Sequence, residues 1–522
     1  MTPLLKAWIA RALAVAAGAG AALAHPPFGL LPGLLGYALL MALIDRADQA
    51  RPLRSAFLRG WLSGLGYFSI GVWWVGEAFL IDAQQAWMAP FAVALLAAGL
   101  ALFWGAAAML YRRFAPAGAR RLLLFAGAVA LLEWLRGHVL TGLPWNLPGE
   151  TFRAGSAVSQ GAAVFGAYGM TWLIVAIAAS LAVVTEGRRG KLAVGLAAAA
   201  LAGLFGYGSW RLAHAAPVAA DAQVVRIVQA DIKQAAKYDA ALFNEILARY
   251  LRLTPSPGRP ADLVIWPEGA IPAGFDDYLA PTAWTRRVIG ESLRPGQTLL
   301  VGGFRVEQGR YYNSLLALAG PQLAVTARYD KHRLVPFGEY LPLEPLWDRF
   351  GVKQMVHVGD GFSPGPPPAP IVLGGGLPVV QPLICYESLF PGFTRGGAAR
   401  AGRRAGLIVN ISNDAWFGIT SGPWQHLNLA SYRSIEEGLP MARATPTGVS
   451  ALVDAYGRSD PRLRLGLGEQ GVIQAPLPPA LAPTLYSRLG DGVLWALLAV
   501  SALSALRLDV KRRLSDTPRP SA

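Results

Sequence analysis

Residues 379–387 read Val-Val-Gln-Pro-Leu-Ile-Cys-Tyr-Glu, a short apolar run that is typical of a buried strand and that ends at a cysteine. Cys385 is the only cysteine among the 522 residues, so it cannot form an intramolecular disulfide. The remaining uses of this thiol are as a nucleophile, as a metal ligand or as a small side chain packed in a core. A lone cysteine does not by itself separate these three uses.

Two other segments carry chemically useful side chains at the edge of an apolar run. Glu268 closes the run Val-Ile-Trp-Pro-Glu at residues 264–268, and Lys331 lies in a polar turn directly before residues 334–339. A carboxylate, an ammonium and a thiol are the base, the oxyanion stabiliser and the nucleophile that acyl transfer through a thioester requires. The three segments together therefore favour the nucleophile interpretation of Cys385.

Strands and helices alternate around these residues. Strands are predicted at residues 224–229, 263–266, 298–302, 379–384 and 407–411, and amphipathic helices at 240–253, 281–293 and 424–438. Such alternation predicts a layered α/β fold, in which functional groups collect where the strands end. Glu268 and Cys385 each follow a predicted strand, so we expect them at one edge of that fold.

The composition of the rest of the chain is that of a membrane protein. It is 53% hydrophobic and 15% charged, and about 20 apolar residues cross the hydrocarbon core. Eight spans are predicted at residues 8–24, 29–45, 60–80, 88–111, 122–140, 162–185, 192–209 and 488–506. We therefore expect a seven-span α-helical bundle at 1–210, a water-facing domain at 211–485, and a final span with a basic tail at 486–522. Trp73 and Trp74 are expected in the aromatic belt at the membrane surface.

The orientation follows from the short loops, because cytoplasmic loops gather Lys and Arg. Basic residues cluster after the second, fourth, sixth and last spans: Arg46, Arg51, Arg54, Arg59, Arg112, Arg113, Arg120, Arg121, Arg188, Arg189, Lys191, Arg507, Lys511, Arg512 and Arg513. The large domain then lies on the outer face of the membrane, whether or not the first span is cleaved as a signal peptide; we expect it to be retained. The net charge of +15 is explained by this topology, and no nucleic-acid partner is expected.

Several longer motifs surround the three candidate residues. They are Trp266-Pro267-Glu268, Asn313-Ser314, residues 331–340, Ile384-Cys385-Tyr386-Glu387, residues 412–418 and residues 422–426. With Glu268, Lys331 and Cys385 as a Glu-Lys-Cys triad, the chain resembles the nitrilase (carbon-nitrogen hydrolase) superfamily. Over nearly its whole length it resembles the membrane branch of that superfamily, the apolipoprotein N-acyltransferases, and this implies a nitrilase-like αββα sandwich carried by the helical bundle.

The resemblance implies a two-step reaction. Cys385 would take an acyl chain from a glycerophospholipid as a thioester and pass it to the α-amine of a diacylated apolipoprotein, with Glu268 as base and Lys331 and the N–H of Tyr386 as oxyanion donors. It also implies a monomer in the bacterial inner membrane, with its catalytic domain on the periplasmic side and with no cofactor or metal.

The same resemblance suggests further site residues. Glu339, Tyr386 and Glu387 would support the triad. Tyr238 stands where the family carries a tryptophan, so its substrate contact is in doubt, and Trp416 is a further candidate for substrate binding. Trp347 and Phe350 belong to an apolar series in the long connection 341–363, which we predict to be a gate that dips into the outer leaflet.

Three alternatives remain open at this point. A membrane-bound amidase or hydrolase of the same superfamily would use the same triad with water as the acceptor. A transporter with an outer binding domain would need ionisable groups deep in its spans. A zinc enzyme is disfavoured because the six histidines show no HExxH-like spacing.

Overall fold

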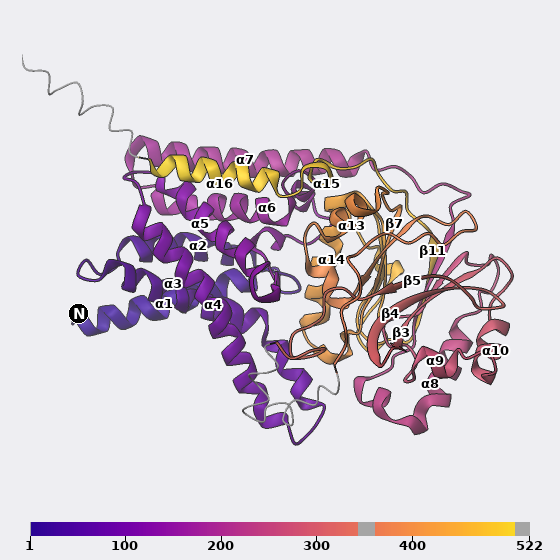
Figure 1. Ribbon diagram of the computed structural model, residues 1–522. Coiled ribbons are helices and arrows are strands. Elements are labelled where there is room, and N and C mark those ends of the chain that lie inside the picture. Colours follow the sequence, from indigo (N-terminus) through magenta and orange to yellow (C-terminus); the bar gives the residue numbers. More distant parts are fainter. Residues whose placement is uncertain (1, 343–360, 507–522) are drawn as a thin grey trace, which may run out of the picture.

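The computed structural model describes residues 2–342 and 361–506, which form a bundle of helices beside a pair of β-sheets (Figure 1). Every predicted span contains a helix. The helices of the bundle are α1 (Pro3–Leu23), α2 (Leu35–Asp45), α3 (Pro52–Gly71), α4 (Ala89–Phe114), α5 (Arg121–Arg136), α6 (Ala162–Ala179), α7 (Gly187–Ala213) and α16 (Gly492–Ala505). The last of these returns to the bundle after the sheets and packs on α5 and α6.

Among the described residues, four helices are long and apolar enough to cross a membrane: Leu4–Leu23, Ala86–Phe114, Val158–Val183 and Gly187–Ala213. The segments Leu31–Asp45 and Gly492–Ala505 are apolar but shorter. The predicted third span at 60–80 changes at Gly71 from α-helix to a 3₁₀ helix, Trp73–Leu80. The membrane character is therefore clear, whereas eight spans remain a prediction.

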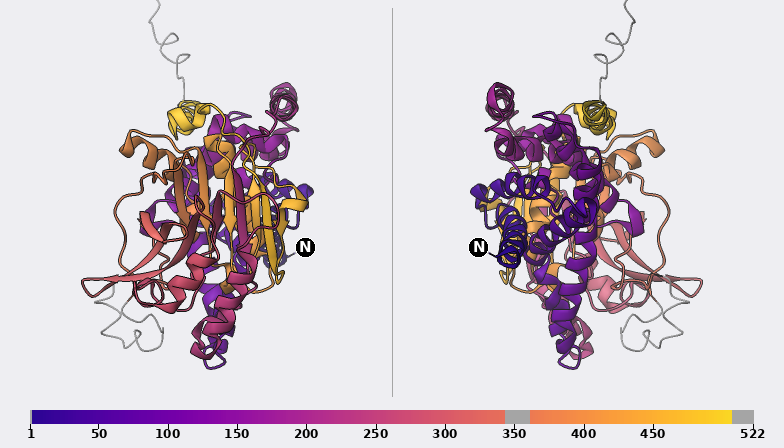
Figure 2. Two further views of the ribbon diagram at one scale, coloured as in Figure 1. Left: turned by 90° about the vertical axis from the view of Figure 1, so that its right-hand side faces the viewer. Right: turned by 90° about the vertical axis from the view of Figure 1, so that its left-hand side faces the viewer.

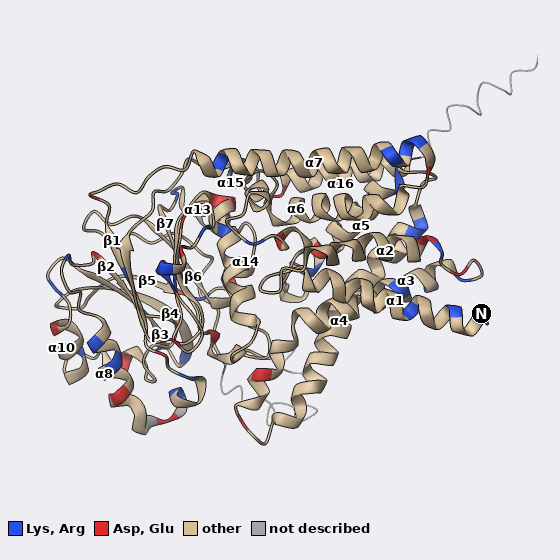
Figure 3. Ribbon diagram, turned by 180° about the vertical axis from the view of Figure 1, so that it is seen from behind, with Lys and Arg blue, Asp and Glu red and all other residues tan. Residues whose placement is uncertain are grey.

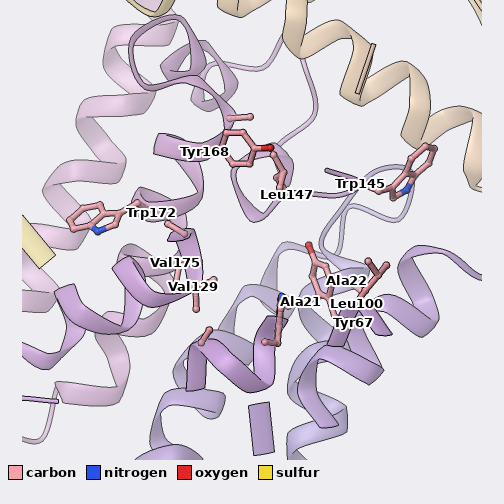
Figure 4. Close-up of a cluster of buried hydrophobic side chains, with 14 of the residues drawn as sticks. Ala21, Ala22, Tyr67, Leu100, Val129, Trp145, Leu147, Tyr168, Trp172 and Val175 are labelled. Carbon is pink, nitrogen blue, oxygen red and sulfur yellow. The ribbon is translucent and has the colours of Figure 1, made fainter. Parts of the chain in front are cut away.

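Glycines let α3 pack tightly against its neighbours. A Cβ at Gly60 would lie 2.4 Å from the carbonyl oxygen of Trp104 on α4, and one at Gly66 would lie 2.3 Å from that of Val15 on α1. The small residues at 60–66 therefore serve close helix packing. Figure 4 shows part of the apolar core of the bundle, to which Tyr67 and Trp172 contribute.

The remaining chain forms two mixed sheets. The six-stranded sheet has the order β11-β1-β2-β3-β4-β5, and the five-stranded sheet has the order β10-β9-β8-β7-β6. The strands are β1 (Val224–Gln229), β2 (Leu263–Ile265), β3 (Thr298–Glu307), β4 (Arg310–Ala319), β5 (Ala324–Asp330), β6 (Val380–Ile384), β7 (Leu407–Ile411), β8 (Met441–Ala444), β9 (Ser450–Val453), β10 (Arg464–Leu465) and β11 (Gly471–Pro476). All five predicted strands are present, and the six others are mostly antiparallel strands whose sequences mix polar and apolar residues.

One apolar cluster joins the two sheets face to face. It contains Ile265 and Leu300 of the first sheet and Ile384 and Ile411 of the second. At Gly302 the sheets approach so closely that a Cβ would lie 2.6 Å from Ile411 Cδ1 and 2.7 Å from the Cα of Glu268. The strand ends of both sheets therefore meet in one region.

Helices cover the outer side of each sheet. Helices α8 (Phe243–Leu253) and α10 (Trp284–Glu291) contribute to a separate apolar cluster with the first sheet. Helix α14 (Gly422–Glu437) lies between the second sheet and the bundle (Figure 1), and residues of all three share one core. The views in Figure 2, along the length of the molecule, show the sheets in front of the bundle in one panel and behind it in the other.

Trp74 does not lie in the aromatic belt that the sequence predicted for it. Only 7% of this residue is exposed, and its indole N–H donates to Gln425 Oε1 on α14 at 3.1 Å. Trp145, from the loop after α5, donates to the same oxygen at 2.9 Å. The placement of Trp74 in a membrane belt is therefore wrong, because its ring lies in the contact between the bundle and the α/β part.

Candidate active site

Cys385 lies at a sharp turn where β6 gives way to a 3₁₀ helix, Cys385–Leu389. Its φ of +49° is in the left-handed region, which is uncommon for a residue with a Cβ. Such local strain is held by the surrounding structure and is frequent at functional sites. The turn also leaves the first backbone N–H groups of the 3₁₀ helix, including that of Tyr386, without intrahelical acceptors.

Glu268 and Lys331 approach this turn from the other sheet, at the ends of β2 and β5. The Lys331 ammonium lies 2.9 Å from Glu339 Oε1 and 3.5 Å from Glu268 Oε1. Asn313 Nδ2 donates to both carboxylates, at 2.6 Å to Glu268 and 2.9 Å to Glu339. The backbone N–H of Asn413 donates to the second oxygen of Glu268 at 2.7 Å. The four side chains thus form one buried, mutually oriented network.

Electrostatics hold the ammonium charged and the thiol neutral. Burial alone would lower the pKa of Lys331, but the charges of Glu339 and Glu268 outweigh it and raise that pKa. Burial raises the pKa of the Cys385 thiol to about 12, and the negative charge of Glu268 adds to this effect, whereas Lys331 opposes it. A thiol in this state becomes nucleophilic by giving its proton to a neighbouring base during attack.

Glu387 joins two segments of the site by buried hydrogen bonds. Its fully buried carboxylate accepts hydrogen bonds from the N–H of Ile384 at 2.8 Å and of His332 at 2.8 Å, and from the Tyr329 hydroxyl at 2.8 Å. Burial raises the pKa of Glu387 to about 7. This one side chain therefore ties the strand before Cys385 to the turn after Lys331.

Tyr386 connects the same turn to the bundle. Its hydroxyl donates to the backbone carbonyl of Gly142, in the loop after α5, and its ring packs edge-on against Phe390. Arg333 makes a parallel contact, donating to the Thr141 carbonyl at 3.1 Å. The predicted support residues Glu339, Tyr386 and Glu387 thus all contact the site or its frame.

Three further residues lie next to the turn of Cys385, and of these the sequence did not single out His426 or Arg443. His426 Nε2 lies 3.3 Å from the carbonyl oxygen of Cys385, and its Nδ1 lies 3.0 Å from Asp414 Oδ1. Arg443 donates to the other oxygen of Asp414 at 2.6 Å. Asp414 and His426 belong to the 412–418 and 422–426 motifs, and these motifs are the sequence feature that could have identified them as site residues. No local sequence pattern distinguishes Arg443.

A second lysine also borders the site. Lys237 Nζ donates to the backbone carbonyl of Glu268 at 3.3 Å, and burial lowers the pKa of this lysine to about 8. Asn313, on β4, bridges the carboxylates of Glu268 and Glu339 and so lies at the centre of the network.

The structure describes two of the four substrate-binding candidates. Tyr238 ends the 3₁₀ helix Gln234–Tyr238, which contains Lys237, and Trp416 is half-buried on the 3₁₀ helix Asp414–Phe417. Trp347 and Phe350, with most of the predicted gate, lie outside the described residues. Within residues 2–342 and 361–506, no group of three or more His, Cys, Asp and Glu side chains is arranged to hold a metal ion.

Comparisons with known proteins divide the chain in the same order. Residues 17–180 match the family model of the apolipoprotein N-acyltransferase N-terminal domain, and residues 224–484 match that of the carbon-nitrogen hydrolases. A protein of Caulobacter vibrioides named apolipoprotein N-acyltransferase is 56% identical over 515 residues, covering 97% of this chain and 96% of the relative. One of the same name from Brucella melitensis is 38% identical, covering 96% of each. A solved CN-hydrolase superfamily protein from Xanthomonas campestris is 19% identical with a TM-score of 0.35, covering 53% of this chain and 97% of its own.

The brace formed by Glu387 gives a first prediction. In Glu387→Gln an amide N–H₂ replaces an accepting oxygen, so a backbone N–H loses its acceptor inside the protein. We expect the free energy of unfolding to fall by about 1–3 kcal/mol and acyl transfer to fall with it, as measured by thermal unfolding and by turnover. Glu437→Gln, which removes another buried carboxylate on α14, is the matched control and should leave turnover unchanged. Equal turnover in the two variants would contradict the role of Glu387 as a brace.

The raised pKa of the thiol gives a second prediction. Because the thiolate is the reactive form, the rate of alkylation of Cys385 by iodoacetamide should rise about tenfold per pH unit between about pH 7 and about pH 10, without a plateau. The Glu268 charge raises the pKa of Cys385, so Glu268→Gln should speed alkylation while it slows acyl transfer. Glu291→Gln, at an exposed position on α10, serves as the control. A plateau near pH 8 would show that a thiolate exists in the resting enzyme.

Proposed function

The chain belongs to the apolipoprotein N-acyltransferase family and is therefore an enzyme of lipoprotein N-acylation, and on that premise we propose that Cys385 carries the acyl group as a thioester. The observation that supports this mechanism most is the meeting of strand ends from two sheets. One sheet supplies Glu268 and the charged Lys331, and the other supplies the strained turn with its neutral thiol.

In the first step the Cys385 sulfur attacks the ester carbonyl of a glycerophospholipid, and Glu268 accepts the thiol proton. The negative charge that develops on the carbonyl oxygen is stabilised by the Lys331 ammonium and by the N–H of Tyr386. The C–O bond then breaks, and the proton held by Glu268 passes to the departing alkoxide. The products are a lysophospholipid and an acylated Cys385.

In the second step the α-amine of the diacylated apolipoprotein attacks the thioester carbonyl. Glu268 accepts a proton from this amine, an amide bond forms, and the C–S bond breaks to restore the thiol. Glu339 and Asn313 hold Lys331 and Glu268 in place during both steps, because each of them touches the network directly. No ATP is needed, since the energy of the acyl ester is carried through the thioester into the amide. We propose that the enzyme works without a cofactor or metal and as a monomer.

We also propose eight spans, a four-layer αββα arrangement of the catalytic domain at 211–485, and a location in the bacterial inner membrane with that domain on the periplasmic side. Figure 3 supports the orientation: basic residues gather at the end of the bundle that lies away from the sheets, where α7 begins. Cytoplasmic loops carry such an excess of Lys and Arg. Tyr238 and Trp416 remain candidates for contact with the substrates.

The thioester can be tested directly. Incubation with radiolabelled phospholipid alone should leave one acyl chain on the wild-type enzyme, removable by hydroxylamine, with an equal burst of lysophospholipid. Cys385→Ala should show neither product, and Lys331→Arg should lose on the order of 10²–10³ in burst rate, because a planar guanidinium does not replace a compact ammonium beside an oxyanion. Steady release of free fatty acid without an amine acceptor would identify a hydrolase instead, and a normal burst in Cys385→Ala would exclude the thioester.

The side of the membrane on which each part lies can be tested by cysteine labelling, because Cys385 is the only cysteine of the chain. In a Cys385→Ala background, a membrane-impermeant maleimide added from outside should label Arg462→Cys, whose side chain is exposed on the α/β part. It should label Arg188→Cys, at the start of α7, only after the membrane is permeabilised. The opposite labelling pattern would reverse the proposed orientation.

A further inference from the structure

A cavity of about 320 Å³ lies at the seam between the bundle and the α/β part. From the bundle side it is bordered by His138, just after α5, and by Tyr168 on α6. From the other side it is bordered by the start of helix α13 (Phe393–Ala401) and by α15 (Leu485–Leu489). None of Glu268, Lys331 and Cys385 lines this seam cavity, so it is separate from the candidate active site.

The lining of the seam cavity is strongly basic. Its charged or titratable basic residues are His138, His332, Arg333, Arg395 and Arg400, against a single carboxylate, that of Asp491. Arg333 is held by the carbonyl of Thr141, Arg395 by that of Ser487, and Arg400 by that of Pro368. A guanidinium has five N–H groups, so each arginine is fixed in place and can still donate to a ligand. The cavity is therefore suited to an anion.

The hydroxyl of Tyr168 points independently to a missing ligand. Only 1% of this residue is exposed, and its hydroxyl has no hydrogen-bond partner in the described part of the chain. The residue stands on α6 in Figure 4, and its oxygen lies so close to Gly137 that a Cβ there would be 1.9 Å away. Buried hydroxyls are normally hydrogen-bonded, so a donor with no partner at the wall of a basic cavity fits an oxygen atom of a bound ligand.

Helix α13 adds a further favourable feature. It begins at the cavity with Gly392, whose φ is +78°, and within its first turn the N–H of Phe393 already donates to the Phe390 carbonyl and that of Arg395 to the carboxylate of Glu437. A helix N-terminus carries partial positive charge and favours phosphate-like groups.

Apolar side chains around the cavity favour an anion that carries hydrocarbon chains. Exposed apolar side chains stand next to its lining residues on both sides: Val139 and Leu140 follow His138, and Leu485 and Leu489 flank Tyr486 and Gly490. Their exposed fractions are 45%, 89%, 46% and 52%. Isolated exposed apolar residues are common, but a group of them beside the ends of membrane helices fits hydrocarbon chains. The site therefore combines a place for a phosphate with a place for acyl chains.

We propose that the seam cavity binds the headgroup of a resident phospholipid, distinct from the acyl donor at Cys385. Its phosphate receives hydrogen bonds from the arginines and from Tyr168, and its chains lie along the exposed residues at the ends of α5 and α15. Asp491 accepts from the Trp134 indole N–H at 3.0 Å and from the Tyr486 hydroxyl at 3.4 Å but forms no ion pair among the described residues, so its charge can receive the ammonium of an ethanolamine headgroup. Such a lipid stabilises the contact between bundle and catalytic domain without taking part in the chemistry.

The test uses the full chain in a Cys385→Ala background, so that no lipid is consumed. Binding of a short-chain phosphatidylethanolamine is measured by native mass spectrometry and by thermal stabilisation. Tyr168→Phe keeps the shape of the side chain and removes only the hydroxyl, and it should weaken binding at least about threefold; Arg400→Gln, at an exposed side chain, should weaken it about tenfold.

Two variants provide matched controls. Tyr250→Phe removes another buried hydroxyl without a described partner, on α8. Arg403→Gln removes an exposed charge just after α13. Neither residue lines the cavity, so both variants should bind the lipid as the parent does. Diacylglycerol with the same chains should not stabilise the protein through this site. Unchanged lipid binding in both Tyr168→Phe and Arg400→Gln would overturn the proposal. If inorganic phosphate alone stabilised the protein as much as the lipid does, and lost this effect in the same two variants, the ligand would be a free anion and not a lipid.

Discussion

One buried carboxylate, that of Glu387, holds together the parts on which the candidate site depends. It accepts N–H groups from the end of β6 and from the turn after β5, and these two elements belong to different sheets. A carboxylate without solvent is costly unless its oxygens are satisfied, so the strand ends must stay where their N–H groups can reach it. The distance between the thiol of one sheet and the ammonium of the other is thereby fixed by a hydrogen-bonding requirement rather than by a covalent link.

The network around Lys331 has a related consequence for reactivity. Its ammonium is paired with two carboxylates, and burial together with the Glu268 charge outweighs its effect on the pKa of Cys385, so the thiol of the resting protein stays neutral. In the proposed mechanism the proton of Cys385 is instead removed by Glu268 at the moment of attack. Such an arrangement protects the only thiol of the chain from adventitious reaction and leaves Lys331 available for charge that develops later on the substrate.

The bundle is also part of the frame of the site. The turn that carries Cys385 is tied to the loop after α5 through Tyr386, and Gln425, next to His426, accepts N–H groups from Trp74 and Trp145. The turn of Cys385 is therefore connected to the helices of the bundle through the loop after α5. A phospholipid in the seam cavity would act on this same contact.

The apolar helices, the five buried strands and the positions of Glu268 and Cys385 at strand ends could be predicted from the sequence alone, because periodicity, apolar runs and side-chain chemistry are local properties. Lys331 was expected in a turn, and its place directly after β5 came only from the tertiary structure. Glu339, Tyr386 and Glu387 were also expected as neighbours through motif resemblance, although their catalytic and supporting roles remain predictions. Only the tertiary structure decided that Asn313 bridges two carboxylates, that His426, Asp414 and Arg443 stand behind the Cys385 carbonyl, and that Trp74 faces α14 and not lipid. Each of these contacts joins residues far apart in the chain, and no local pattern records which distant partner will satisfy a buried polar group once the sheets and helices have packed.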